Sequence, residues 1–71
     1  MQFNAIYKKI GKWYVAWVEE VPGANTQGRT LKEARENLRE SLELVLEANR
    51  QISREYVGKQ EYIREPVHAA R

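Results

Sequence analysis

The sequence predicts an α+β domain in which an antiparallel sheet of three to four strands carries one long helix on one face, in the order β-β-β-α-β. Two segments rich in aromatic and β-branched residues, 2–8 and 13–18, are separated by a glycine, which is typical of a β-hairpin. A polar strip with a Pro-Gly turn follows. Residues 31–52 then repeat apolar side chains at steps of three and four, which predicts an amphipathic helix.

The hairpin turn lies in the segment KIGK, with Gly11 as its turn signal. A turn centred on residues 10–11 gives the cross-strand pairs Phe3 with Val18, Ala5 with Ala16, and Tyr7 with Tyr14. Side chains alternate between the two faces of a sheet. One face then carries Phe3, Ala5, Tyr7, Tyr14, Ala16 and Val18, and the other carries Asn4, Ile6, Lys8, Trp13, Val15 and Trp17. Because both faces are largely apolar, both are expected to be covered.

The polar strip connects the hairpin to the helix. Pro22 and Gly23 predict a turn, and residues 24–28 supply a short third strand. The segment TLKE is a capping box: the Thr30 hydroxyl accepts from the Glu33 amide, and the Glu33 carboxylate accepts from the Thr30 amide. The helix is therefore expected to begin at Thr30.

The predicted helix has one apolar stripe, made of Leu31, Ala34, Leu38, Leu42, Val45, Leu46, Asn49 and Ile52. Leu44 lies almost opposite this stripe. We expect the helix to end near residues 53–56, with Gly58 in the left-handed geometry of a helix stop. Residues 61–69 predict a final strand, which Pro66 confines to an edge because it has no amide hydrogen to donate.

One helix covers one sheet face and leaves the other. Ala5 and Ala16 make a shallow place where a helix approaches closely, so we assign their face to Leu38, Leu42 and Val45. The face with Trp13, Val15 and Trp17 then has no internal cover. Burial of about 300 Å² of such surface is worth roughly 7 kcal/mol before association costs, at about 25 cal/mol per Å². This face therefore predicts an interface.

Composition excludes several classes of protein. The 71 residues form one domain near the lower size limit for a sufficient core. The absence of cysteine excludes disulfides and thiolate metal sites, and a single histidine leaves no usual zinc site. Twelve basic and ten acidic residues are scattered along the chain, unlike a nucleic-acid footprint. Without a signal peptide or a long apolar run, we expect a soluble cytoplasmic protein that does not enter a membrane.

The glycine-closed hairpin, the strand YVAW and the segment PGANTQGRTLKEARENLRESL together resemble the HicB family of antitoxins. The matched positions are Pro22, Gly23, Thr26, Gly28, Thr30, Glu33, Ala34, Asn37 and Glu40. The resemblance covers residues 1–52 and implies a partial ribonuclease H-like fold. It also implies an antitoxin of a type II toxin-antitoxin pair, which binds and neutralises a small RNA-cleaving toxin of the HicA type. Assembly into a homodimer or tetramer is implied as well.

The resemblance has one departure. Longer HicB antitoxins carry a C-terminal helix-turn-helix or ribbon-helix-helix that binds DNA. The 13 residues after Gly58 are too few for either. We therefore expect a single HicB-like domain over residues 1–71, with no separate DNA-binding domain and no DNA binding by this chain.

No catalytic residue, metal site or cofactor is predicted. Ribonuclease H-like enzymes hold metal ions with clustered carboxylates, but this chain has no aspartate and its first strand has no carboxylate. Glu19 and Glu20 point to opposite sides of an extended chain and are interpreted as a solvated strand end. Glu33 is used in the helix cap, and His68 has no carboxylate partner in an evident motif. The chain is therefore not expected to be an enzyme.

The predicted interface consists of Ile6, Trp13, Val15 and Trp17, with Leu44 as a secondary contact. The predicted structural motif consists of Pro22, Gly23, Gly28, Thr30, Glu33 and Asn37, with Asn37 bonded to the 22–28 loop. Three interpretations of the tryptophans remain open: the core of another arrangement, a protein interface, or a stacking platform for single-stranded RNA beside Lys8, Lys9 and Lys12. The interface interpretation corresponds to a non-catalytic antitoxin or to an orphan self-associating adaptor. The stacking interpretation corresponds to an RNA-binding regulator.

Overall fold

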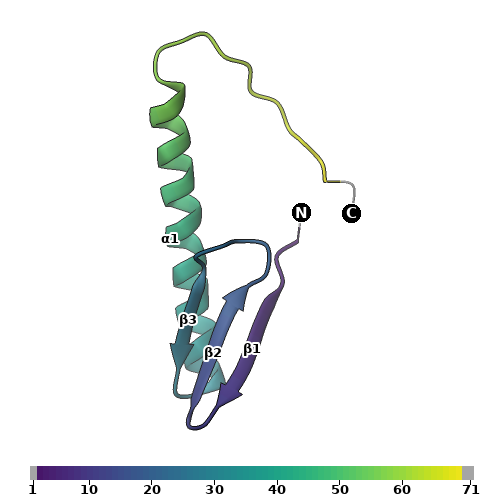
Figure 1. Cartoon of the computed structure of the whole chain (residues 1–71), viewed down its shortest axis with the longest axis vertical. Helices are drawn as coiled ribbons and strands as arrows, with labels where there is room; N and C mark the ends of the chain where they lie inside the picture. Colours follow the sequence, from purple (N-terminus) through teal and green to yellow (C-terminus); the bar gives the residue numbers. More distant parts are fainter. Residues whose placement is uncertain (1, 70–71) are drawn as a thin grey trace.

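The computed structural model describes residues 2–69 and contains a three-stranded sheet with one long helix across one face (Figure 1). The strands are β1 (Ala5–Ile10), β2 (Trp13–Val18) and β3 (Asn25–Gly28), and the helix is α1 (Leu31–Val57). The strands lie in the order β1-β2-β3, and both neighbouring pairs are antiparallel. The predicted α+β architecture is confirmed.

The hairpin register differs from the predicted one by two residues. Ile10 pairs with Trp13 and Ala5 pairs with Val18, so the loop consists of residues 11–12 and the predicted centre at residues 10–11 is wrong. Gly11 occupies the first loop position with φ +61°, where a two-residue hairpin loop favours glycine. Because a shift of two residues equals one full side-chain period, each face keeps the side chains that were assigned to it.

The turn between β2 and β3 forms as predicted. The Ala24 amide donates to the Val21 carbonyl at 3.1 Å, with Pro22 and Gly23 as the two central residues. Gly23 has φ +91°, which matches the third position of a type II turn. Val21 and Ala24 are buried at either end of this turn, so the turn also closes one end of the core.

The core lies between the sheet and α1, on the face that the sequence assigns to the helix. Its buried members are Ala16, Val18, Val21, Ala24, Ala34 and Leu38. Tyr7, Tyr14, Leu42, Val45 and Leu46 pack against them. Ala16 and Ala34 are among the most deeply buried, so small side chains let the helix approach the sheet closely.

Thr30 begins α1 as predicted, because its hydroxyl accepts from the Glu33 amide at 3.0 Å. The second half of the predicted capping box is wrong. Glu33 Oε1 accepts from the Arg29 amide at 3.3 Å instead of the Thr30 amide, so the carboxylate reaches one residue further back. At the other end α1 runs to Val57, slightly past the predicted end at residues 53–56. Gly58 donates its amide to the Arg54 carbonyl, which confirms it as the helix stop, but with φ +59° and ψ −137° it does not have the predicted left-handed helical geometry.

The helix is longer than the sheet it covers. Its 27 residues extend about 40 Å at 1.5 Å per residue, whereas a strand of 6 residues extends about 20 Å. The second half of α1 therefore projects beyond the sheet (Figure 1). Asn49 and Ile52, which the sequence places on the packed stripe, lie on this projecting half and are exposed, so the stripe meets the core only as far as Leu46.

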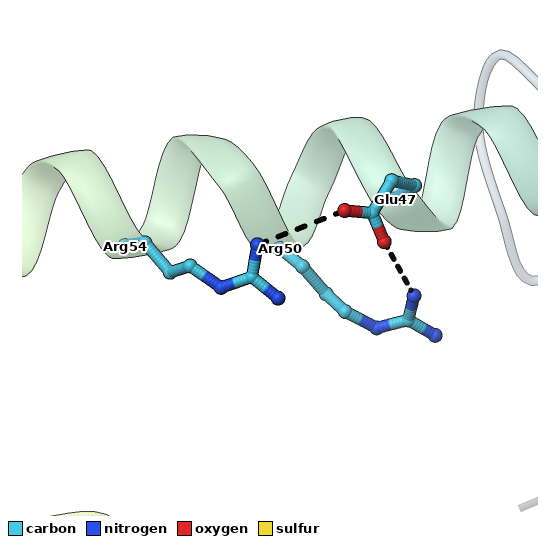
Figure 2. A network of polar contacts seen from close by, with 3 residues as sticks. All are labelled: Glu47, Arg50 and Arg54. Atoms are coloured by element: carbon cyan, nitrogen blue, oxygen red, sulfur yellow. Dashed lines mark hydrogen bonds and ion pairs between the residues drawn. The ribbon is translucent and has the colours of Figure 1, made fainter.

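Among the described residues, side-chain polar contacts on the projecting half are confined to the helix itself. Figure 2 shows Glu47 between two arginines, with Oε2 3.0 Å from Arg50 Nη1 and Oε1 3.6 Å from Arg54 Nη1. All three side chains are more than half exposed, so each ion pair contributes less than about 1 kcal/mol. These contacts support the helix without attaching it to the sheet.

The predicted final strand is wrong: residues 61–69 pair with no strand. We call these residues the tail. They leave the distal end of α1 and run back outside the domain (Figure 1). The physical reason is the length of α1, which places Gly58 well beyond the sheet, so the tail lies beside the projecting half of the helix. A β-forming sequence alone does not place a strand next to an edge.

Candidate functional site

The sheet face opposite α1 carries the residues that the sequence assigns to an interface. We define the tryptophan face as Ile6, Ile10, Trp13, Val15 and Trp17. Strand pairing sets these side chains in rows: Ile6 lies beside Trp17, Val15 lies between Lys8 and Gln27, and Ile10 lies beside Trp13. Four of the five predicted interface residues are therefore brought together on two adjacent strands.

The tryptophan face has no cover among residues 2–69. Trp13 is 40% exposed and Trp17 is 38% exposed, while Ile6 and Val15 between them are half-buried. The helix lies on the other side of the sheet (Figure 1). In this chain the tryptophans are thus surface residues, and the interpretation as core of another arrangement finds no support.

Two further hydrophobic residues bear on the extent of the tryptophan face. Ile10 was assigned to the turn, but the shifted register makes it the last residue of β1 and puts it beside Trp13. Leu44, the predicted secondary contact, is 71% exposed and belongs to α1. The sheet therefore separates Leu44 from the tryptophan face, and the two do not form one continuous surface.

The rim of the tryptophan face is polar and carries positive charge. The Arg29 guanidinium lies 5.3 Å from the centre of the Trp13 ring, within the range of a cation–π contact. Lys8 and Gln27 flank Val15, and Asn25 lies beside Trp17. An apolar centre with aromatic residues and a polar rim is the usual composition of a protein interface. Arg29 was missed because it follows β3 in a position that only the three-strand pairing reveals.

The matched motif residues form the scaffold behind this face. Asn37 Nδ2 donates to the Gln27 carbonyl at 3.0 Å, which confirms the predicted bond from Asn37 to the 22–28 loop. Ser41, one helical turn further, donates its hydroxyl to the Asn25 carbonyl at 3.2 Å. These two bonds attach β3 to α1. Ser41 was missed, although its spacing of four residues from Asn37 places both on one side of a helix.

Gly28 is required where β3 meets the first turn of α1. A Cβ atom at this position would lie 2.7 Å from the Ala34 amide nitrogen and 3.1 Å from its Cα. Contacts of this kind to backbone atoms are not relieved by a side-chain rotation. Gly28 therefore allows the closest approach between sheet and helix, which accounts for its place in the motif.

Glu20 lies at the solvent-accessible end of β2, as interpreted, but it also has a bonding role that the sequence did not predict. Its carboxylate accepts two hydrogen bonds from Asn4, one from the backbone amide at 2.7 Å and one from the side-chain amide at 2.8 Å. These bonds, the backbone one first, hold the pKa of Glu20 below its ordinary value of 4.5. Glu20 thus fastens the chain just before β1 to the end of β2, while Glu19 is exposed.

The described part of the chain offers no other chemical centre. No group of three or more His, Cys, Asp or Glu side chains in residues 2–69 is arranged to hold a metal ion. His68 is exposed in the tail. Within the same residues, no helix has the length and apolar character that a membrane crossing requires.

Comparison with known proteins gives one informative match. A UPF0150 protein from Thermotoga maritima is 53% identical over 47 residues, and the match covers 63% of this chain and 63% of that protein. The matched region is thus less than two thirds of either chain. No protein-family model matches the chain. No solved structure matches it either.

Proposed function

We propose that this chain is a non-catalytic, cytoplasmic antitoxin-like module that binds and neutralises a small RNA-cleaving toxin of the HicA type. The observation that carries the proposal is the tryptophan face, a continuous apolar surface with no cover in residues 2–69. The spacing of the motif residues, which resembles HicB antitoxins, supplies the class of partner. The scaffold contacts of Asn37 and Gly28 account for that spacing without a reactive group.

Inhibition in this proposal is steric. Large aromatic side chains at the centre of a surface lose the most contact with water on binding and act as anchors. Trp13 and Trp17 have this role, and the half-buried Ile6 and Val15 form the floor between them. Arg29 and Lys8 at the rim orient the partner through hydrogen-bond acceptors on its surface. The bound toxin is thereby denied access to RNA.

The test uses a purified HicA-type toxin, with an RNA cleavage assay and a titration of binding. Trp17→Ala is expected to weaken toxin binding at least about fivefold, which corresponds to about 1 kcal/mol or more, and to weaken inhibition in parallel. Tyr56→Ala is the matched control, since Tyr56 is an exposed aromatic residue on the projecting half of α1. Equal binding by wild type and Trp17→Ala would remove the proposal.

One observation favours a second candidate function, the binding of single-stranded RNA. Arg29 over Trp13, with Lys8 nearby on the same face, is the combination of aromatic and cationic groups on which bases stack. This function predicts that a single-stranded RNA quenches tryptophan fluorescence at low salt and is released as the salt concentration rises. Quenching by RNA together with no effect of the toxin would replace the first candidate with the second.

A further inference from the structure

The two edges of the sheet are not equivalent. The Asn25 and Gln27 carbonyls on the outer side of β3 accept from Ser41 and Asn37 of α1, so this edge is occupied. On β1, the Asn4 carbonyl accepts from the Glu19 amide, which sets the alternation of hydrogen bonds along the hairpin. The backbone groups of Ala5, Tyr7 and Lys9 therefore point away from β2, and no described residue bonds to them. The edge of β1 is open.

An apolar groove runs beside this open edge, between β1 and α1. It is lined by Phe3, Ala5, Tyr7 and Leu42, with Arg35 and Arg39 from the helix. Phe3 and Ala5 are exposed along it, and the Arg35 guanidinium lies 5.8 Å from the centre of the Tyr7 ring. A strand added to β1 would place every second side chain in this groove. The groove therefore fits a strand whose groove-facing side chains, at every second position, are alternately apolar and acidic.

The tail has this alternation. Glu61, Ile63, Glu65 and Val67 fall on one side of an extended chain, and Tyr62, Arg64, Pro66 and His68 fall on the other. The first set offers two apolar side chains and two carboxylates to a groove with two arginines. In its own molecule this set is unused, because Ile63 is 88% exposed and Val67 is 89% exposed.

The direction of such a strand follows from Pro66 and from the charges. Pro66 has no amide hydrogen, so its nitrogen must face away from β1 and the odd-numbered residues must bond to β1. In a strand antiparallel to β1, the residues whose backbone groups bond to β1 also have their side chains on the α1 side of the sheet. The same relation holds between β2 and β3, where Tyr14 and Ala16 face β3 with their backbone groups and pack on the core with their side chains. A parallel strand would instead put Arg64 and His68 beside Arg35 and Arg39. Only the antiparallel direction satisfies both conditions.

The tail cannot meet this requirement within its own molecule. In Figure 1 β1 and the tail both descend, at an angle to each other, so the tail is not antiparallel to β1, and it starts from the end of the projecting helix. A wide cleft separates it from that helix, lined by Leu46, Arg50, Ser53, Tyr62, Ile63 and Val67. A second copy of the chain, turned by a two-fold axis, brings its tail to β1 in the opposite direction. Exchange of identical segments is a low-cost route to a dimer.

We propose that residues 61–67 of one copy form a fourth strand antiparallel to β1 of a second copy, and reciprocally, with Ile63 and Val67 in the apolar groove and Glu61 and Glu65 beside Arg35 and Arg39. The interface is on the edge of the sheet and leaves the tryptophan face free. It is therefore independent of the proposed function, and either can fail without the other.

The test is a charge reversal with mixing, followed by sedimentation of the full chain. One variant carries Arg35→Glu and Arg39→Glu, and the other carries Glu61→Arg and Glu65→Arg. Each variant alone brings charges of the same sign together at the interface. It is therefore expected to raise the dimer dissociation constant at least about tenfold. A mixture of the two restores opposite charges at both contacts, and heterodimers form with a dissociation constant within about threefold of wild type. A variant that had merely unfolded would not be rescued by mixing.

A backbone test addresses the edge itself. Lys9→Pro removes an outward amide hydrogen and is expected to raise the dimer dissociation constant about tenfold, whereas Lys9→Gln, which removes the charge and keeps the amide, has an effect below about threefold. A monomeric wild type, the absence of heterodimers in the mixture, or a dimer that Trp17→Ala abolishes and Lys9→Pro does not, would each overturn the proposal. The last result would place the contact between copies on the tryptophan face.

Discussion

Glu20 illustrates how a charged side chain can replace a backbone carbonyl as the hydrogen-bond acceptor at the end of a strand pair. In a regular ladder the Asn4 amide would donate to the Glu19 carbonyl, just past β2, and the Glu20 carboxylate takes the place of that acceptor. The lowered pKa follows, because both bonds from Asn4 favour the charged form. The ionised carboxylate is thus part of the fold at neutral pH.

This contact predicts a pH-dependent stability difference. The pKa of Glu20 is lower in the folded chain than its ordinary value of 4.5, so its contribution is complete above about pH 4.5 and is lost as the pH falls through the folded pKa. Glu20→Gln is expected to be less stable than wild type at pH 7, and the difference should shrink by pH 3. Urea midpoints at the two pH values measure it. Glu19→Gln controls for the loss of one negative charge, and a difference independent of pH would contradict this role of Glu20.

Gly28 acts at the same scale through volume. A methyl group at this position meets the Ala34 backbone at 2.7 Å, so sheet and helix must separate to admit it. Gly28→Ala is expected to lower the free energy of unfolding by about 1–3 kcal/mol, the usual cost of overpacking. Chemical denaturation measures this, with Gln27→Ala on the exposed face of β3 as the control. If both variants unfold at the wild-type midpoint, the close approach is not a constraint.

At the scale of elements, local signals predicted the structure better than signals that depend on a distant partner. The Pro22-Gly23 turn and the Thr30 cap depend on bonds within four residues, and both form. The hairpin register was wrong, yet the faces were right, because the displacement was a full side-chain period. The assignment of side chains to the two sheet faces was therefore more robust than the assignment of cross-strand residue pairs.

The failures concern elements whose surroundings lie far away in sequence. Residues 61–69 have the amino-acid composition of a strand. Composition does not determine which edge of the sheet such a strand pairs with, or whether the chain can reach that edge. Ile10, Arg29 and Ser41 acquire their roles only from the order of three strands and the helix behind them. The exposure of Trp13 and Trp17 could be predicted because an apolar face opposite a single helix has no other cover in the described chain.

For the whole molecule, the unequal lengths of sheet and helix divide stability along the long axis of 52 Å. The first half of α1 packs on the core through Ala34, Leu38 and Leu42, and opening it requires global unfolding. Beyond Leu46, the projecting half has ion pairs with exposed side chains, and none of its described residues packs against the core. Its helical hydrogen bonds are therefore open to local fraying. One element thus contains two regions of different stability.

Hydrogen exchange tests this division on the monomeric form. In the Arg35→Glu, Arg39→Glu variant, amides of residues 34–46 are expected to exchange near the rate set by global unfolding, and amides of residues 49–57 at least about tenfold faster, because these can open locally. In wild type at high concentration, a dimer formed by exchange of tails that packs against the projecting half would slow amide exchange there. Amide exchange in residues 34–46 would stay nearly unchanged. Uniform protection along α1 in the dilute variant would contradict the division, since it would require a contact that holds residues 49–57 within a single copy.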